Sequence, residues 1–172
     1  MASALHRLLH PPHAALLLAL ASAGILLAAL GLEYSGVATP CQLCTWQRYP
    51  YLAVIGLGLL GYWWHPRLML GVTALVLIGN AGLAGYHVGI EQGWFALPSG
   101  CAAGTEATSV DQLRELLAAA PPACDQVSFT FFGLSLAAWN IVTCLALACY
   151  AAATALGLER RTAQDRLAPT RG

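Results

Sequence analysis

Four long apolar runs without a charged residue constrain this chain more than any other feature of its sequence. They cover residues 14–32, 49–64, 68–90 and 129–156. A helix needs about 20 apolar residues to cross the hydrocarbon core of a bilayer. The second run reaches that length if its helix starts a few residues earlier. We therefore predict one domain with four spans, and the predicted spans are 14–32, 45–64, 68–90 and 129–156.

The composition agrees with a membrane protein and excludes other classes. Hydrophobic residues make up 58% of the chain and charged residues only 9%, against roughly 25% charged residues in soluble domains. The eight basic residues balance the eight acidic ones, so the basic stripe of a nucleic-acid-binding protein is missing. The apolar content is too high for a disordered chain. The predicted fold is an all-α, integral membrane four-helix bundle.

The distribution of arginines predicts which side each loop faces. Six arginines lie in the N-terminal segment, the turn after the second run and the tail 157–172, and two lie elsewhere. Positive residues favour the cytoplasmic side, so we expect both termini there and the loops 33–44 and 91–128 outside. The first run also resembles a signal peptide, with Ala21-Ser22-Ala23 as a cleavage motif. Its apolar residues continue to Leu32, which favours an uncleaved span.

Four cysteines fall on the outer, disulfide-permissive side: Cys41, Cys44, Cys101 and Cys124. Cys41 and Cys44 form a Cys-x-x-Cys motif at a predicted helix start, where the helix N-terminus and nearby cations lower a thiol pKa. Arg48 follows Cys44 by one helical turn, so it can stabilise a Cys44 thiolate or polarise a quinone carbonyl. The alternative is an inert disulfide with Arg48 at the membrane interface.

The pair Cys101 and Cys124 has two interpretations. It is either a staple that closes the outer loop or a relay that exchanges electrons with the Cys-x-x-Cys motif through mixed disulfides. A four-cysteine zinc site is a weaker alternative, because the second pair lacks the close spacing of such sites. We predict no metal.

Several other residues carry a prediction. His87, near the outer end of the third run, is either a functional ionisable group or a hydrogen-bonded core histidine. Cys144 and Cys149 do not share a helix face, and we interpret them as packing residues. Core packing is likewise expected of Trp139. Within the outer loop, residues 109–117 have the cap and the apolar spacing of a short amphipathic helix.

These features together resemble the DsbB family of bacterial inner-membrane disulfide bond formation proteins. The matching stretches are Pro40-Cys-Gln-Leu-Cys-Thr-Trp-Gln-Arg48, Gly85-Tyr-His-Val-Gly-Ile-Glu91 and Cys124-Asp-Gln-Val-Ser-Phe-Thr-Phe-Phe-Gly-Leu-Ser-Leu136. The motif Cys-x-x-Cys-x-x-x-Arg, combined with four spans and a second cysteine pair, makes the resemblance specific. Gln47 occupies a position that is acidic in some members.

The resemblance implies an activity and a role for each site residue. The family reoxidises a periplasmic thioredoxin-like oxidase, DsbA, and passes electrons to ubiquinone or menaquinone. By analogy, Cys101 forms the mixed disulfide with the partner and Cys124 is its disulfide mate. Cys124 then exchanges with Cys41, while Cys44 faces the quinone. Arg48 and His87 match the quinone-site arginine and histidine.

Two alternatives remain. The first is a vitamin K epoxide reductase-like protein, although in that family the quinone-side Cys-x-x-Cys follows the loop pair instead of preceding it. The second is a membrane scaffold with a disulfide-stapled outer loop, like the tetraspanins, whose larger loop and Cys-Cys-Gly signature are missing here.

Overall fold

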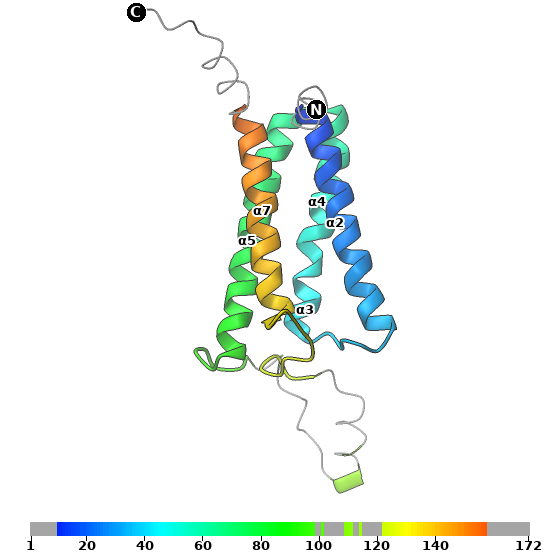
Figure 1. Cartoon of the computed structure of the whole chain (residues 1–172), viewed down its shortest axis with the longest axis vertical. Helices are drawn as coiled ribbons and strands as arrows, with labels where there is room; N and C mark the ends of the chain where they lie inside the picture. The colour runs from blue at the N-terminus through cyan, green and yellow to red at the C-terminus, as the bar shows by residue number, and fades with distance from the viewer. Residues whose placement is uncertain (1–9, 99–100, 102–108, 112–113, 115–121, 158–172) are drawn as a thin grey trace, which may run out of the picture.

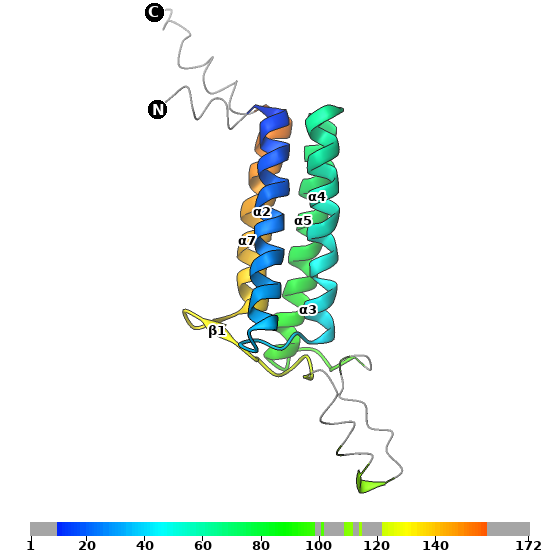
Figure 2. The same ribbon diagram turned by 90° about the vertical axis from the view of Figure 1, so that its right-hand side faces the viewer.

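The structure is a computed structural model, and it describes residues 10–98, 101, 109–111, 114 and 122–157. Its elements are α2 (Pro11–Tyr34), α3 (Gln42–Trp46), α4 (Arg48–Trp63), α5 (Pro66–Glu91), β1 (Thr130–Phe131), β2 (Leu134–Ser135) and α7 (Leu136–Leu156). Four long helices run side by side as a bundle, and short α3 precedes α4 at one end (Figure 1). Turned by 90°, the same helices form two layers, α2 with α7 and α4 with α5 (Figure 2).

The helices match the apolar runs that predict them. Among the described residues, α2, α5 and α7 are long and apolar enough to cross a membrane. Helix α4 has 16 residues, about 24 Å of rise, and α3 extends its path toward the cysteine motif. Proline occupies the first turn of α2 and of α5, where its missing N–H leaves no hydrogen bond unmade. The prediction of an all-α membrane protein is confirmed.

One helix start differs from the predicted span. The run 129–156 is helical only from Leu136, because β1 and β2 form a small hairpin before it. Phe132 and Gly133, the two turn residues, both have positive φ, 49° and 77°, as a tight hairpin turn requires. Ser135 then caps α7 by accepting a hydrogen bond from the Ala138 N–H. An apolar run alone does not reveal such a turn.

Small residues let α2 and α4 approach closely. A Cβ atom at Gly58 would lie 2.5 Å from the Ala15 carbonyl oxygen and 2.8 Å from the Ala19 Cβ. Small-residue contacts of this kind are how membrane helices gain van der Waals packing without a hydrophobic driving force between them. This close contact therefore fixes α4 against α2, and it also fixes the cysteine motif that precedes α4.

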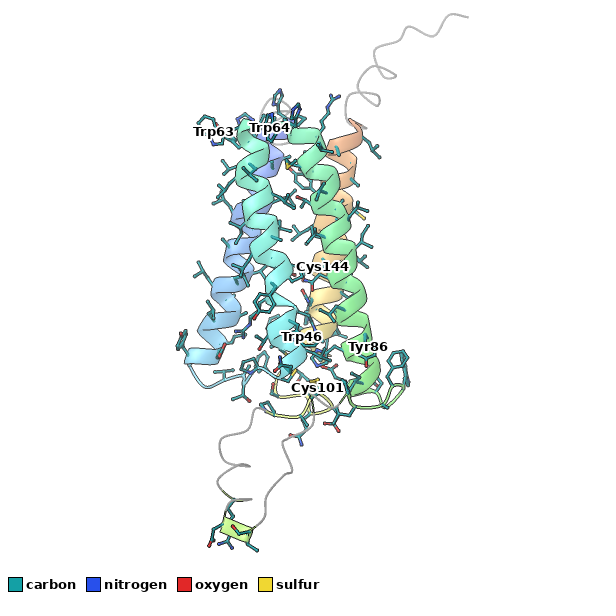
Figure 3. All side chains as sticks on the ribbon, turned by 180° about the vertical axis from the view of Figure 1, so that it is seen from behind. Trp46, Trp63, Trp64, Tyr86, Cys101 and Cys144 are labelled. Atoms are coloured by element: carbon teal, nitrogen blue, oxygen red, sulfur yellow. A yellow bond between two sulfur atoms is a disulfide. The ribbon has the colours of Figure 1, made fainter. Side chains whose placement is uncertain are left out.

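Exposed tryptophans lie at both ends of the bundle (Figure 3). Trp63 and Trp64 are exposed at one end, whereas Trp46 is exposed at the other end, where the buried Cys101 also lies (Figure 3). Tryptophans at both ends suit the two interfaces of a bilayer. The start of α2 and the end of α7 lie at the same end of the bundle, opposite α3 (Figure 1). The predicted amphipathic helix 109–117 lies mostly outside the described residues.

Candidate functional site

The Cys41–Cys44 motif forms the start of α3, where the first loop ends. Cys41 is the N-cap of α3, and its Sγ accepts a hydrogen bond from the Cys44 backbone N–H at 3.3 Å. Both cysteines are free thiols, and their Sγ atoms lie 3.1 Å apart. The motif thus holds a reduced pair at a distance where one sulfur hydrogen-bonds to the other.

The pKa values of the two thiols are shifted in opposite directions. The hydrogen bond from Cys44, supported by His87 against the effect of burial, lowers the pKa of Cys41 to about 4. The pKa of Cys44 is raised, because its proton makes that hydrogen bond and because the thiol is buried. In this reduced pair the thiolate therefore forms at Cys41. The Cys44 thiolate beside Arg48 stays a prediction.

His87 on α5 reaches the motif as the matching stretch suggests. Its Nε2 lies 3.6 Å from the Cys41 Sγ and 3.9 Å from the Glu91 Oε1. Ser135, the cap of α7, donates a 2.6 Å hydrogen bond to the other oxygen of Glu91. The ends of α5 and α7 are thereby joined directly beside the thiols.

The second cysteine pair is a disulfide packed against the first. Cys101 and Cys124 are bonded, with Cα atoms 5.3 Å apart. Together with Cys41 they form one buried cluster that also contains Leu43 and Ile90. Cys124 is completely buried and Cys101 is 5% exposed. Because two of the four cysteines form this bond, the four-thiolate zinc site is not formed.

The thiols of Cys41 and Cys44 and the ring of His87 lie close enough together to hold a metal ion, with their ligand atoms within 4.8 Å of one another. Two sulfurs bound to one tetrahedral zinc ion lie about 3.8 Å apart, farther than the 3.1 Å between Cys41 and Cys44. The arrangement is that of a hydrogen-bonded dithiol with a histidine at its thiolate.

A cavity of about 290 Å³ opens beside the dithiol, close to the lower limit of about 300 Å³ for small-molecule sites. Its walls are mostly apolar residues of α2 and α7, including Leu26, Leu32 and Leu136. Cys41, Cys44, Arg48, His87 and Glu91 supply its polar side.

Arg48 lies at this cavity, but it also has a partner that the sequence did not suggest. Its Nη1 lies 2.6 Å from the Glu33 Oε2, at the end of α2. The guanidinium has five N–H donors, so one carboxylate does not exhaust it. Trp139 lines the same cavity and donates a hydrogen bond to the Phe131 carbonyl, so it has a polar role besides the predicted packing.

Sequence analysis did not assign to the site a set of polar residues that lies behind the thiols: Gln47, Tyr51, Asn80, Asn140 and Cys144. Gln47, 6% exposed, binds His87, and Asn140 binds Gln47. The available signal was the two asparagines inside otherwise apolar runs. The interpretation of Cys144 as a packing residue is incomplete, because its Sγ lies within hydrogen-bonding distance of Tyr51 and Asn80. Cys149 is exposed.

Comparison with known proteins identifies the family. The family model described as Disulfide bond formation protein DsbB matches residues 11–154. The chain belongs to the DsbB family. It is also 33% identical over 139 residues to Disulfide bond formation protein B of Methylococcus capsulatus, covering 74% of this chain and 84% of that protein. No solved structure matches it.

Family membership carries a coarse function with it. This chain is a membrane-embedded disulfide bond formation protein and a thiol oxidoreductase. The resemblance stated from the sequence is confirmed, and the vitamin K epoxide reductase-like alternative is set aside. The roles of the individual cysteines, Arg48 and His87 remain predictions.

Proposed function

We propose that this chain reoxidises a periplasmic DsbA-like, thioredoxin-fold oxidase and passes the electrons to ubiquinone or menaquinone in the bacterial inner membrane. Both termini then face the cytoplasm and both cysteine pairs face the periplasm, as the arginine distribution predicts. The observation that carries the proposal is the place of the dithiol. Cys41 and Cys44 lie between a buried disulfide on one side and an apolar cavity on the other.

The thiol–disulfide exchange steps need no outside oxidant. An electron acceptor is needed only afterwards, to reoxidise Cys41 and Cys44. The partner's dithiol reduces the Cys101–Cys124 bond, which oxidises the partner and leaves two thiols. The Cys124 thiolate then attacks the Sγ of Cys41 in a Cys41–Cys44 disulfide, and Cys44 leaves as a thiolate. The Cys101 thiolate attacks Cys124, which restores their bond and leaves Cys41 and Cys44 reduced. A bonded second pair beside two free thiols, as in this structure, corresponds to that final state.

The residues of the cavity fit a quinone. Apolar walls from α2 and α7 suit its ring and tail, and the Arg48 guanidinium suits a carbonyl oxygen. A bound quinone supplies a sink for two electrons and two protons. Both ring nitrogens of His87 already have partners, Gln47 and Cys41. We therefore assign quinone contact to Arg48 first, and to His87 mainly the stabilisation of the Cys41 thiolate.

The test is quinone reduction by the purified protein with a reduced DsbA-like partner as electron donor. We expect steady turnover in the wild type and in Cys149→Ala, whose exposed thiol lies outside the site. Cys44→Ala should not turn over. If Cys44→Ala reduces quinone as fast as the wild type, the thiol pair is not the electron donor. A stapled scaffold would show no turnover in any variant despite an intact Cys101–Cys124 bond.

A further inference from the structure

A continuous chain of polar side chains runs from the middle of the bundle to the thiols. Figure 3 places Cys144 midway along the helices and Cys101 at the end. Asn80 and Cys144 are 1% and 0% exposed. Buried polar groups at membrane depth are costly unless they are hydrogen-bonded. These polar residues are needed neither for the close packing of α2 against α4 nor for the electron transfer proposed above. Their arrangement therefore needs an explanation of its own.

The hydrogen bonds of this polar network can be followed from its buried end toward the thiols. The Asn80 Nδ2 lies 3.2 Å from the Gln47 backbone carbonyl, which can only accept, so the amide nitrogen must face it. The same Nδ2 donates to the Cys144 Sγ at 3.3 Å. The Cys144 S–H is then left to donate, with the Asn140 Oδ1 at 3.4 Å and the Tyr51 hydroxyl, which itself donates to that Oδ1, at 3.2 Å.

The same logic carries the direction to His87. Since the Asn140 Oδ1 accepts from Cys144, and from the Tyr51 hydroxyl at 2.5 Å, its Nδ2 faces the Gln47 Oε1 and donates to it at 2.6 Å. That contact turns the Gln47 Nε2 toward the His87 Nδ1, 2.9 Å away. A donor facing Nδ1 requires that Nδ1 carry no proton.

The other ring nitrogen meets acceptors. The His87 Nε2 faces the Cys41 Sγ at 3.6 Å and the Glu91 carboxylate at 3.9 Å. A neutral imidazole whose Nδ1 accepts carries its proton on Nε2. The ring therefore presents an N–H to the sulfur that the site favours as a thiolate.

We infer that Asn80, Cys144 and Asn140 are positioning residues that orient the Gln47 amide and thereby fix His87 as the neutral tautomer that donates from Nε2 to Cys41. The inference rests on the proposed function only for its effect on turnover. It also gives position 47 a meaning. A glutamine here donates to Nδ1, whereas an acidic residue at this position accepts from it and requires a protonated Nδ1.

Two substitutions at Cys144 separate this role from packing. Cys144→Ser keeps a hydroxyl that accepts from Asn80 and donates to Asn140, whereas Cys144→Ala removes both bonds. A packing role predicts that alanine is tolerated better than a buried serine. The hydrogen-bond chain predicts the reverse. Cys149→Ala, on the exposed side of the same helix, is the matched control.

The primary measurement is the ¹⁵N NMR spectrum of histidine-labelled, reduced protein in lipid nanodiscs, with the His87 signals assigned through His87→Gln. We expect Nδ1 unprotonated and Nε2 protonated in the wild type, Cys144→Ser and Cys149→Ala, and a mixture of tautomers in Cys144→Ala. The second measurement is the pH midpoint of Cys41 alkylation, which should rise by about one pH unit in Cys144→Ala only. The titratable or charged groups facing Cys41 across the cavity are Cys44, Arg48, Tyr51, His87 and Glu91.

If Cys144→Ala does not fold, Gln47→Glu tests the inference instead. A carboxylate cannot donate, so a protonated Nδ1 should appear in this variant. An Nδ1 that stays unprotonated in Gln47→Glu, or a tautomer unchanged in folded Cys144→Ala, would overturn the inference. Neither measurement needs quinone or partner, so a wild type that fails to reduce quinone contradicts the proposed function alone.

Discussion

The two cysteine pairs are built for different tasks. Cys41 and Cys44 lie at a helix start, and their neighbours are hydrogen-bonding groups: a backbone N–H, a histidine and each other. Cys101 and Cys124 join two segments outside the long helices and pack against apolar residues such as Leu43 and Ile90. The first environment controls the acidity of a thiol, and the second keeps a disulfide out of contact with solvent.

Removing one cysteine from each pair should give the largest effects and should separate the two tasks. Cys44→Ala should lower quinone reduction by at least about 1,000-fold with any electron donor. Cys101→Ala should lose oxidation of the partner protein but keep quinone reduction driven by dithiothreitol. Both rates follow from absorbance assays. Equal losses with dithiothreitol in the two variants would break the division of labour between the pairs.

Arg48→Ala should have the next largest effect, confined to the cavity side. Loss of the guanidinium should raise the KM for quinone about tenfold, the usual scale for one charge-assisted hydrogen bond. The mixed disulfide with the partner at Cys101 should still form, because that pair lies in the other cluster. Steady-state kinetics and trapping of the mixed disulfide test the two statements. A normal KM would remove Arg48 from the quinone site.

The lowered pKa of Cys41 should change the rate of its alkylation several-fold, by an amount that depends on pH. With its pKa lowered from the ordinary value of 9.0 to about 4, Cys41 in the reduced protein should react with iodoacetamide at a nearly constant rate from pH 6 to 8. In the unfolded chain the rate should climb steeply over that range. The Cys44→Ala variant lacks one hydrogen bond to Cys41, so wild-type reduced protein is the proper sample, with mass spectrometry to locate the label.

His87→Leu sharpens the same measurement. Losing the Nε2 donor should raise the midpoint of Cys41 alkylation, whereas the exposed Cys149 should be labelled as before.

The lowered pKa of Cys41 also has a consequence for the stability of the protein. Its contribution to the folded, reduced protein is complete above pH 9 and is lost as pH falls toward about 4, so from pH 5 to 8 stability should rise. A Cys41 midpoint near 9 in the folded wild type would contradict this account.

The smallest effect is expected at the ion pair beside the cavity. Glu33→Gln removes the partner of Arg48, but both side chains are partly exposed, 22% and 36%. Such pairs contribute less than about 1 kcal/mol to stability. Thermal unfolding should therefore change little, and the KM for quinone should fall slightly, since the guanidinium is released. A KM that rises instead would show that Glu33 holds Arg48 in its binding position.

The sequence reveals the scaffold well because a bilayer leaves few choices. Apolar runs near 20 residues form helices in lipid, since every backbone group must be satisfied internally. The Cys-x-x-Cys spacing and its arginine then identify the family. The hairpin before α7 was not predicted, because Phe132 and Gly133 continue an apolar run and their backbone conformation leaves no mark on hydropathy.

The connections within the site were much harder to predict. His87 and Asn140 come from two different helices, α5 and α7, and Gln47 comes from the turn between α3 and α4. Which polar residues meet therefore depends on how those helices are rotated. Glu33 and Arg48 are likewise 15 positions apart and meet only because the first loop folds back. Residue types and local spacing identify the reactive groups, whereas the contacts that adjust them belong to the packed bundle.

The burial of the second disulfide sets a limit on speed. With Cys124 at 0% and Cys101 at 5% exposure, an attacking thiol meets the bond only during brief excursions that uncover it. Raising the concentration of the donor protein should increase the rate only up to the frequency of those excursions. Small thiols should reach the same ceiling as a large protein, because both wait for the same opening. A plateau common to unrelated donors is then a property of this chain and not of the molecule that attacks it.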